Sequence, residues 1–283
     1  MNSKNILLFI IIIGCFFKME AQKIAISKPA DSASIGKLLK YDARIALRGV
    51  GNSFTQPLRW EKRDFVKFST LMVGTFALSF IDEEAHDYFI GIEPDVPNFF
   101  KSFGWYAGSP QNYFAATAGI YGFGLLTKNE KVRKTGVLII AASFTTGVFQ
   151  SVTKFAVGRA RPSENVGSSS FKPFTREGSY HSFPSGHTIL SVTMAHSIAK
   201  QFDNVWVKTG IYTLGSIAPI SRLLEGAHWL TDVVFSTVIS IVIVDGIDKF
   251  LFKTKAYDYP TKEKVISWNL KFSNNQIGLI GVF

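Results

Sequence analysis

Three short segments in the second half of the chain combine residue types that could bind and attack a phosphate group. In chain order they are Lys154 to Pro162, Pro184 to His187, and Ser221 to Asp232. Together they supply fixed cations, two histidines, a hydroxyl, a glycine turn and a carboxylate. Each element alone is common in proteins, so the inference depends on the ordered set.

His228 and Asp232 are four residues apart, so on a helix their side chains share one face. A carboxylate bonded to one imidazole nitrogen fixes the tautomer and leaves the other nitrogen free as a nucleophile. A surface His–Asp pair is the alternative, and for these two residues alone it is the better interpretation. Trp229 and Leu230 between them indicate a partly buried face and weaken that alternative.

The segment from Pro184 to His187 follows a polar loop and begins an apolar run of helical length. Ser185 suits the N-cap position, and the free N–H groups of a helix start bind anions. Gly186 lets the backbone approach such an anion closely. His187 then lies in the first turn, where it can protonate a leaving oxygen. For this motif alone, a capped helix start with an exposed histidine is the simpler alternative.

Lys154 and Arg161 are seven residues apart and so share one helix face, and Pro162 is expected to end that helix. Two cations at a helix end can clamp phosphoryl oxygens, and Arg222 offers a third from another segment. The alternative is a basic helix terminus favoured by the helix dipole. Arg159 fits this alternative best.

The ordered set resembles the three-part signature of the type 2 phosphatidic acid phosphatase / vanadium haloperoxidase superfamily. The resemblance covers roughly residues 64–252, and every signature position is present: Lys154, Arg161, Pro162, Pro184, Ser185, Gly186, His187, Ser221, Arg222, His228 and Asp232. Leu224 stands where many relatives carry Tyr, and Leu230 where Pro is frequent. These departures leave the lipid-phosphatase subfamily open.

The resemblance implies an all-helical core and phosphate transfer without a metal or other cofactor, with vanadate binding as a phosphate mimic. It implies that His228 attacks phosphorus to form a phosphohistidine and that Asp232 orients it. His187 would protonate the leaving group. The residues that would hold the phosphate oxygens are Lys154, Arg161, Ser185, Gly186 and Arg222. No carboxylate cluster suggests a metal site, and we interpret the acidic run from Asp82 to Asp87 as a solvated helix end.

The predicted fold is an all-α bundle of about six core helices with a short C-terminal β-like hairpin. Apolar stretches of helix length recur at about 64–81, 112–127, 135–154, 186–200, 207–220 and 231–252. The segments Val265 to Leu270 and Ile277 to Phe283 predict the two strands. We divide the chain into a signal peptide (1–21), a polar leader (22–63), the helical domain (64–252) and a tail (253–283).

The N-terminus predicts export, because Lys4, the apolar run from Ile6 to Phe17 and the small Ala21 have the layout of a signal peptide. A membrane anchor is the alternative. The basic residues cluster at the helix ends opposite the motifs, which favours six spans with the motifs outside. However, a cleaved signal peptide would start the first span on the wrong side, and only 12 residues separate Asp232 from Asp245. We expect a membrane-associated bacterial envelope protein whose site faces the periplasm, with a soluble bundle as the alternative.

The net charge of +10 indicates an anionic partner, and the scattered Lys and Arg argue against nucleic acid. We therefore expect a phosphatase acting on a phosphomonoester or pyrophosphate, most simply a lipid phosphate. A broad-specificity periplasmic acid phosphatase, a vanadate-dependent haloperoxidase and a non-catalytic phosphate-binding envelope protein are the alternatives. An aromatic stretch from Phe99 to Tyr106 could admit an acyl chain or pack against the bundle.

Overall fold

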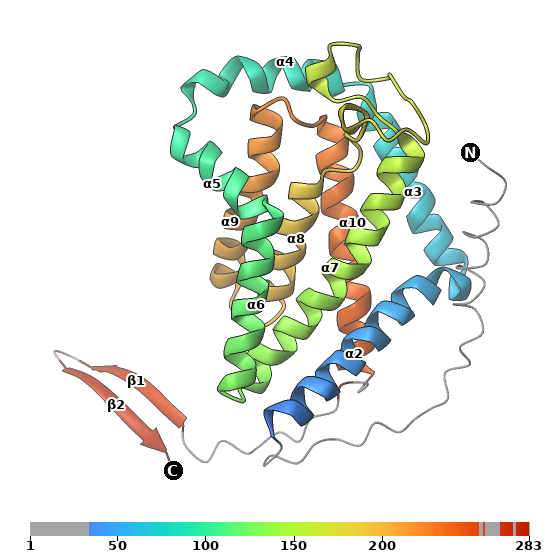
Figure 1. The fold of residues 1–283 in the computed structure, drawn as a ribbon. Coiled ribbons are helices and arrows are strands. Elements are labelled where there is room, and N and C mark those ends of the chain that lie inside the picture. Colours follow the sequence, from blue (N-terminus) through green and yellow to red (C-terminus); the bar gives the residue numbers. More distant parts are fainter. Residues whose placement is uncertain (1–33, 255–256, 258–266, 274–275, 283) are drawn as a thin grey trace.

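The computed structural model describes residues 34–254, 257, 267–273 and 276–282, and this part of the chain is dominated by helices (Figure 1). The predicted all-α class is confirmed. The helices are α2 (Ile35–Thr55), α3 (Lys62–Ser79), α4 (Asp82–Ile92), α5 (Asn98–Gly108), α6 (Pro110–Leu126), α7 (Glu130–Val157), α8 (Gly186–Ala199), α9 (Val205–Leu224) and α10 (Leu230–Asp248). A π-turn, Lys249–Lys253, continues α10.

The six apolar stretches correspond to α3 and α6 to α10, with shifted ends. Helices α4 and α5 are additional, because each has only 11 residues, which is too short for a clear periodic pattern. Towards the C-terminus, strands β1 (Ser267–Ser273) and β2 (Gln276–Val282) pair antiparallel. The predicted signal peptide, residues 1–21, lies outside the described residues.

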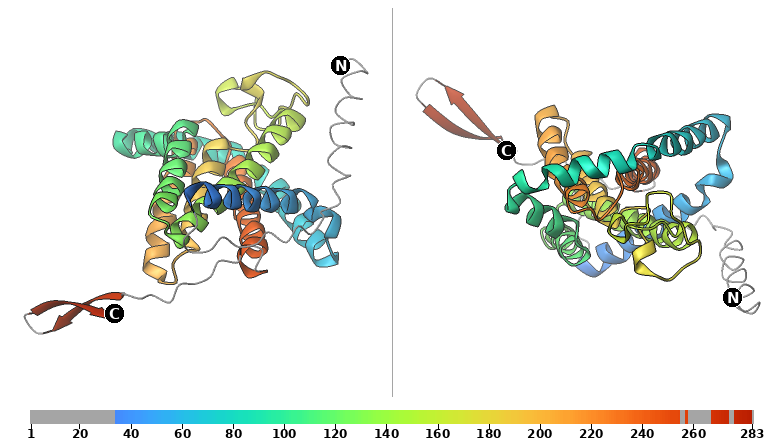
Figure 2. Two further views of the ribbon diagram at one scale, coloured as in Figure 1. Left: turned by 60° about the horizontal axis from the view of Figure 1, so that its bottom comes forward. Right: turned by 90° about the horizontal axis from the view of Figure 1, so that it is seen from above.

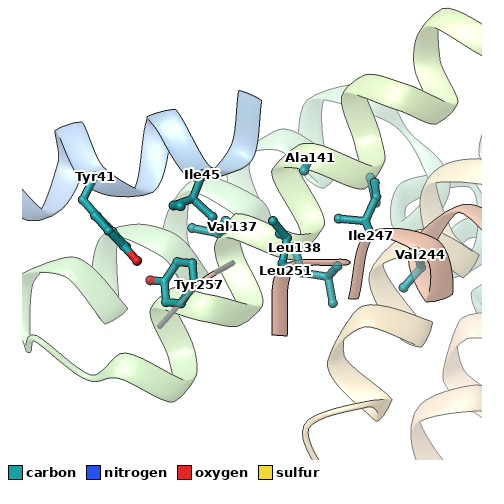
Figure 3. Close-up of a cluster of buried hydrophobic side chains, with 10 residues drawn as sticks. Tyr41, Ile45, Val137, Leu138, Ala141, Val244, Ile247, Leu251 and Tyr257 are labelled. Atoms are coloured by element: carbon teal, nitrogen blue, oxygen red, sulfur yellow. The ribbon is translucent and has the colours of Figure 1, made fainter. Parts of the chain in front are cut away.

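Helix α2 packs on the bundle through a hydrophobic cluster that it shares with α7 and α10 (Figure 3). Tyr41 and Ile45 point from α2 into this cluster, and Tyr257 from beyond the π-turn joins it. We placed residues 22–63 in a leader and residues 253–283 in a tail. The structure instead brings α2 and Tyr257 into the core of the helical domain, because their apolar faces find partners only in the folded bundle.

The three motifs meet at one end of the bundle because of the order of the helices. Helices α7 and α9 end there, and α8 and α10 begin there (Figure 1). Helix α4 and the segment 158–185 lie across this end, as the view from above also shows (Figure 2). Helix α2 crosses the bundle near the opposite end (Figure 1).

Two of the described helices are long and apolar enough to cross a membrane: Glu130–Val157 and Leu230–Lys253. A third candidate arises if Lys62–Ser79 and Asp82–Asp95 form one span, although they are bent by 62°. Helix α3 has no buried residue and exposes large apolar side chains such as Val73 and Phe76, and Phe80 directly after it is exposed as well. Exposed apolar surface on this scale marks contact with a membrane or with other protein. Together with the candidate spans, it indicates membrane association.

Candidate active site

The two cations of the first motif converge, but they do not share a helix face as predicted. Helix α7 ends at Val157, because Gly158 adopts a left-handed conformation with φ of 57°. A side chain at Gly158 would collide with the carbonyl of Lys172, so this tight turn needs glycine. Arg161 therefore lies in the segment after α7. Lys154 Nζ and Arg161 Nη2 nevertheless both donate to the backbone carbonyl of His181.

His228 and Asp232 also meet without sharing a helix. Helix α10 begins at Leu230, so His228 lies just before it and Asp232 in its first turn. His228 Nδ1 is 3.5 Å from Asp232 Oδ2, at the outer limit of a hydrogen bond. Its other nitrogen, Nε2, is 3.4 Å from Arg161 Nη1. One ring nitrogen thus faces the carboxylate, and the other faces the cation that would hold a phosphate.

Asp232 is completely buried and is held by several donors. Its Oδ2 accepts hydrogen bonds from Ser182 Oγ at 2.5 Å and from the backbone N–H of Trp229 at 2.9 Å. The second of these is part of a capping box that begins α10. Ser182 Oγ also lies 3.5 Å from His228 Nδ1. Ser182 was not among the predicted site residues, because no spacing links it to the motifs.

Arg159 was interpreted as a basic helix terminus, and this interpretation is wrong. Its guanidinium is buried and binds Asp232 Oδ1 at 2.8 Å and Asp82 Oδ2 at 2.6 Å. The residue also stacks over the ring of Trp229, 5.5 Å from its centroid. A second hydrogen bond from Nη1 reaches Thr231 Oγ1. Arg159 therefore supports the carboxylate that faces His228.

The acidic run from Asp82 to Asp87 was interpreted as a solvated helix end, and for Asp82 this interpretation is wrong. Its carboxylate is fully buried and accepts hydrogen bonds from the N–H and the hydroxyl of Thr231, at 2.9 and 2.6 Å. Thr231 lies in the first turn of α10, so Asp82 satisfies a free N–H at that helix start from another helix. The other acids of the run, Glu83, Glu84 and Asp87, keep the expected exposed character, and Glu83 Oε1 accepts from Ser168. Helix α4 thereby fixes the segment that carries His228.

The second motif begins α8 as predicted, with Ser185 at the N-cap and His187 in the first turn. The Ser185 side chain makes no capping bond, and its oxygen accepts a hydrogen bond from Thr188 Oγ1. Gly186 faces Gln150 of α7, since a Cβ there would lie 2.6 Å from Gln150 Nε2. His187 Nε2 is a buried atom without a hydrogen-bond partner among the described residues. That nitrogen is available to a bound group.

Arg222 lies in the last turn of α9 and is buried at this end of the bundle. It is paired with Glu225, whose Oε1 accepts from Nη2 at 2.6 Å. Ser221 Oγ accepts further hydrogen bonds from the same guanidinium. Glu225 is a site residue that the motif pattern did not indicate. Glu225 thus binds the cation that a phosphate would need.

The lowered pKa values of His187 and His228 make both histidines neutral near pH 7. Burial lowers the pKa of His228 to about 4, although Asp232 opposes this shift. Burial also lowers the pKa of His187 to about 4, and the positive charges of Arg222, Arg161 and Lys154 lower it further. All the predicted cations thus act on one imidazole. The described residues contain no group of three or more His, Cys, Asp and Glu that could hold a metal ion.

Comparison with known proteins gives partial matches to lipid phosphatases. Lipid A 1-phosphatase of Rhizobium etli is 32% identical over 124 residues, which cover 41% of this chain and 53% of that protein. Lipid A 1-phosphatase of Porphyromonas gingivalis is 24% identical over 130 residues, covering 45% of this chain and 26% of that protein. The chain thus spans about half or less of the length of these curated relatives.

Among solved structures, Aquifex aeolicus LpxE matches with a TM-score of 0.45 and 20% identity, covering 60% of this chain and 95% of that one. The model of the PAP2 superfamily matches residues 135–254. This range contains all three motifs, from Lys154 to Asp232. The family model and the complete ordered signature thus fall on the same segment, and this segment matches the PAP2 superfamily.

Proposed function

We propose that this protein is a lipid phosphatase that works without a metal, through a phosphohistidine on His228. The observation that carries the proposal is the placement of the two His228 ring nitrogens. Nδ1 lies beside a buried, multiply held carboxylate, and Nε2 lies beside Arg161. A neutral imidazole with its tautomer fixed in this way is a nucleophile.

In the first step, His228 Nε2 attacks phosphorus and forms an N–P bond while the bond to the leaving oxygen breaks. His187 gives that oxygen a proton through its unpartnered Nε2. Lys154, Arg161 and Arg222 neutralise the phosphoryl oxygens, with the Ser185 hydroxyl and the Gly186 N–H as further donors. Phosphoryl transfer needs mostly positioning and charge neutralisation, which these groups supply.

His187 needs a proton for this step, and burial together with the neighbouring cations lowers its pKa to about 4. A bound phosphate dianion would offset the neighbouring cations and so raise that pKa. In the second step, His187 accepts a proton from water, whose oxygen attacks phosphorus as the N–P bond breaks. Asp232 stabilises the cationic His228 ring between the steps.

A lipid substrate is favoured by the surroundings of the site. Trp105 of α5 lies 6.4 Å from the His187 ring, centroid to centroid, and about half of it is exposed. Phe99, Phe103 and Tyr106 of the same helix are also exposed, so α5 carries several exposed aromatic side chains as well as the contact with His187. The named relatives act on lipid A, and this supports a lipid phosphate or pyrophosphate as substrate class. We place the site at the periplasmic face of the membrane.

The test is phosphate release by purified protein with EDTA present. The panel compares phosphatidic acid, phosphatidylglycerophosphate, undecaprenyl pyrophosphate and lipid A with p-nitrophenyl phosphate. We expect turnover of a lipid substrate and inhibition by vanadate. His228→Ala should lose turnover, and labelled phosphate should be trapped on histidine only in the unsubstituted protein. Undiminished turnover by His228→Ala would refute the nucleophile. Preference for p-nitrophenyl phosphate over all lipids would instead indicate a broad-specificity phosphatase.

A further inference from the structure

We propose that α2 is an interfacial helix that lies on the anionic surface of the membrane leaflet opposite the active site. With the site at the periplasmic face, α2 lies on the cytoplasmic side, and this departs from the export that the signal-peptide layout predicts. This inference does not depend on the catalytic function. It starts from the three separate faces of α2. One face is buried in the bundle, the second is basic, and the third is apolar and exposed.

The buried face of α2 fixes how the helix is rotated. Asp42 forms a buried salt bridge with Arg133 Nε at 2.7 Å and accepts hydrogen bonds from Tyr121 and Tyr257. Ile45 is completely buried beside it. Because this face carries both an ion pair and core packing, α2 cannot turn to hide its other residues. The remaining faces must therefore point away from the bundle.

The basic face is a stripe of four exposed cations at helical spacing: Lys37, Lys40, Arg44 and Arg48. The only acidic residue of α2 is Asp42, which is buried, so no acid of this helix offsets the stripe. Beside it runs the apolar face, with Leu39, Leu47 and Phe54 at compatible spacing. Leu47 is 70% exposed. A basic face next to an exposed apolar face is the pattern of a helix lying in a membrane interface.

The position of α2 along the bundle fits one leaflet. Gly49 packs against Ile247 and Leu251, since a Cβ there would lie 3.3 and 3.4 Å from their side chains. Ile247 is 15 residues from Asp232 on α10, which corresponds to about 22 Å of helix. The hydrocarbon core of a bilayer is about 30 Å thick. A helix at this distance from the site comes near the opposite membrane surface.

Charge favours an anionic bilayer over other occupants. The same end of the bundle carries further cations, at the start of α7 and the end of α10: Lys131, Lys134, Lys249 and Lys253. A second copy docked through this face would bring two basic stripes together, which is repulsive. Nucleic acid would leave the apolar face exposed. Anionic headgroups and the adjoining acyl region satisfy both faces at once.

The experiment measures the depth of a spin label in the full chain reconstituted in vesicles. One variant carries the label at Leu47→Cys in a Cys15→Ser background. A second variant in the same background carries it at Ser163→Cys, an exposed position at the site end, and serves as the aqueous reference. Collision with oxygen reports the acyl region, and collision with a water-soluble nickel chelate reports water. In vesicles containing phosphatidylglycerol, we expect the Leu47 label to favour oxygen and the Ser163 label to favour nickel.

The charge dependence separates this proposal from simple contact with lipid. We expect Arg44→Gln to lower the interfacial population of the Leu47 label about fivefold, the share of one basic residue near an anionic surface. The matched control, Arg176→Gln at the opposite end, should leave it unchanged. Pure phosphatidylcholine vesicles should lower it further, with unchanged helix content by circular dichroism. Equal nickel access of both labels in every vesicle would overturn the proposal. So would dipolar broadening of the Leu47 signal, which would show a second copy on this face.

Discussion

The guanidinium of Arg159 lies 2.8 Å from Oδ1 of Asp232, the carboxylate that faces the candidate nucleophile. Its other terminal nitrogen lies 2.6 Å from Asp82. One buried cation thus connects two buried carboxylates from helices far apart in sequence. Because Asp82 also binds the first turn of α10, this network fixes both Asp232 and the backbone that carries His228. Arg159 and Asp82 are positioning residues in this arrangement.

We predict that Arg159→Lys lowers kcat by about 10- to 100-fold with little change in KM, since a misplaced orienting group affects the transition state more than binding. Lysine keeps the charge but cannot bridge two carboxylates with a planar fork. Arg159→Met should also destabilise the protein by about 3–5 kcal/mol, because it leaves buried carboxylates uncompensated. Kinetics on a soluble ester and thermal unfolding in detergent measure the two effects.

The double variant Asp82→Asn/Arg159→Met distinguishes positioning from stability alone. It removes one carboxylate together with the cation, so part of the stability should return. Activity should stay low, because Asp232 is still unsupported. Recovery of kcat together with stability would show that Arg159 acts only on folding.

The hydrogen bond from Ser182 to Asp232 gives a second prediction. Ser182→Ala removes a donor at 2.5 Å from a buried carboxylate, which we expect to cost about 1.5–3 kcal/mol of transition-state stabilisation, or about 10- to 100-fold in kcat. Asp232→Asn should lose more rate and keep its affinity for phosphate. Competition by inorganic phosphate provides the affinity. Equal activity of Asp232→Asn and the unsubstituted protein would rule out the orienting role.

The pair between Arg222 and Glu225 gives a third prediction. In the proposed mechanism Arg222 binds the substrate phosphate, so its partner Glu225 would compete with that phosphate, and Glu225→Gln should free the guanidinium and lower KM severalfold. Arg222→Gln should raise KM instead, and the double variant should resemble Arg222→Gln. A higher KM in Glu225→Gln would mean that Glu225 holds Arg222 in its binding position rather than competing for it.

The sequence was sufficient for the fold class and for the meeting of the three motifs at one end of the bundle, since helix-length apolar runs and motif order are local patterns. It did not identify the support of the site, because that support is tertiary. Arg159 pairs with Asp82 across 77 positions of sequence. A cation near a helix end and an acid in a charged run have the same local pattern whether they are solvated or buried together.

Helix geometry was predicted less well than the meeting of side chains. We expected Lys154 and Arg161 on one helix, and His228 and Asp232 on another. Gly158 ends α7 early, and α10 begins only at Leu230. Both pairs still meet, because the turn at Gly158 and the extended N-cap Trp229 keep these residues at the same end of the bundle. Spacing alone cannot tell a continuous helix from a turn that gives a similar convergence.

The lowered pKa values of the two histidines predict a loss of stability in acid. Both pKa values are about 4 in the folded protein, against an ordinary value of 6.5. Between these values the unfolded chain binds more protons, so the stabilising contribution is complete above pH 6.5 and is lost as pH falls towards 4. Thermal midpoints in phosphate-free detergent should fall over this window, and less steeply in His187→Gln. An unchanged slope in that variant would contradict the assignment.

The contact of α5 with the site gives the last prediction. A Cβ at Gly108 would lie 2.8 Å from the side chain of His187, which is closer than Cβ atoms approach other non-bonded atoms in proteins. Gly108→Ala should therefore displace the proposed general acid and lower kcat by at least about tenfold, as expected for misplaced proton transfer. The matched control is Gly147→Ala in the middle of α7, where a Cβ meets nothing within 4 Å. This control should keep its activity and gain up to about 1 kcal/mol in stability, since alanine favours a helix more than glycine does.

Because a leaving group that needs no proton makes a general acid dispensable, the loss in Gly108→Ala should be much smaller with p-nitrophenyl phosphate than with an alkyl phosphate. An equal loss with both substrates would show that α5 shapes the pocket as a whole rather than holding His187.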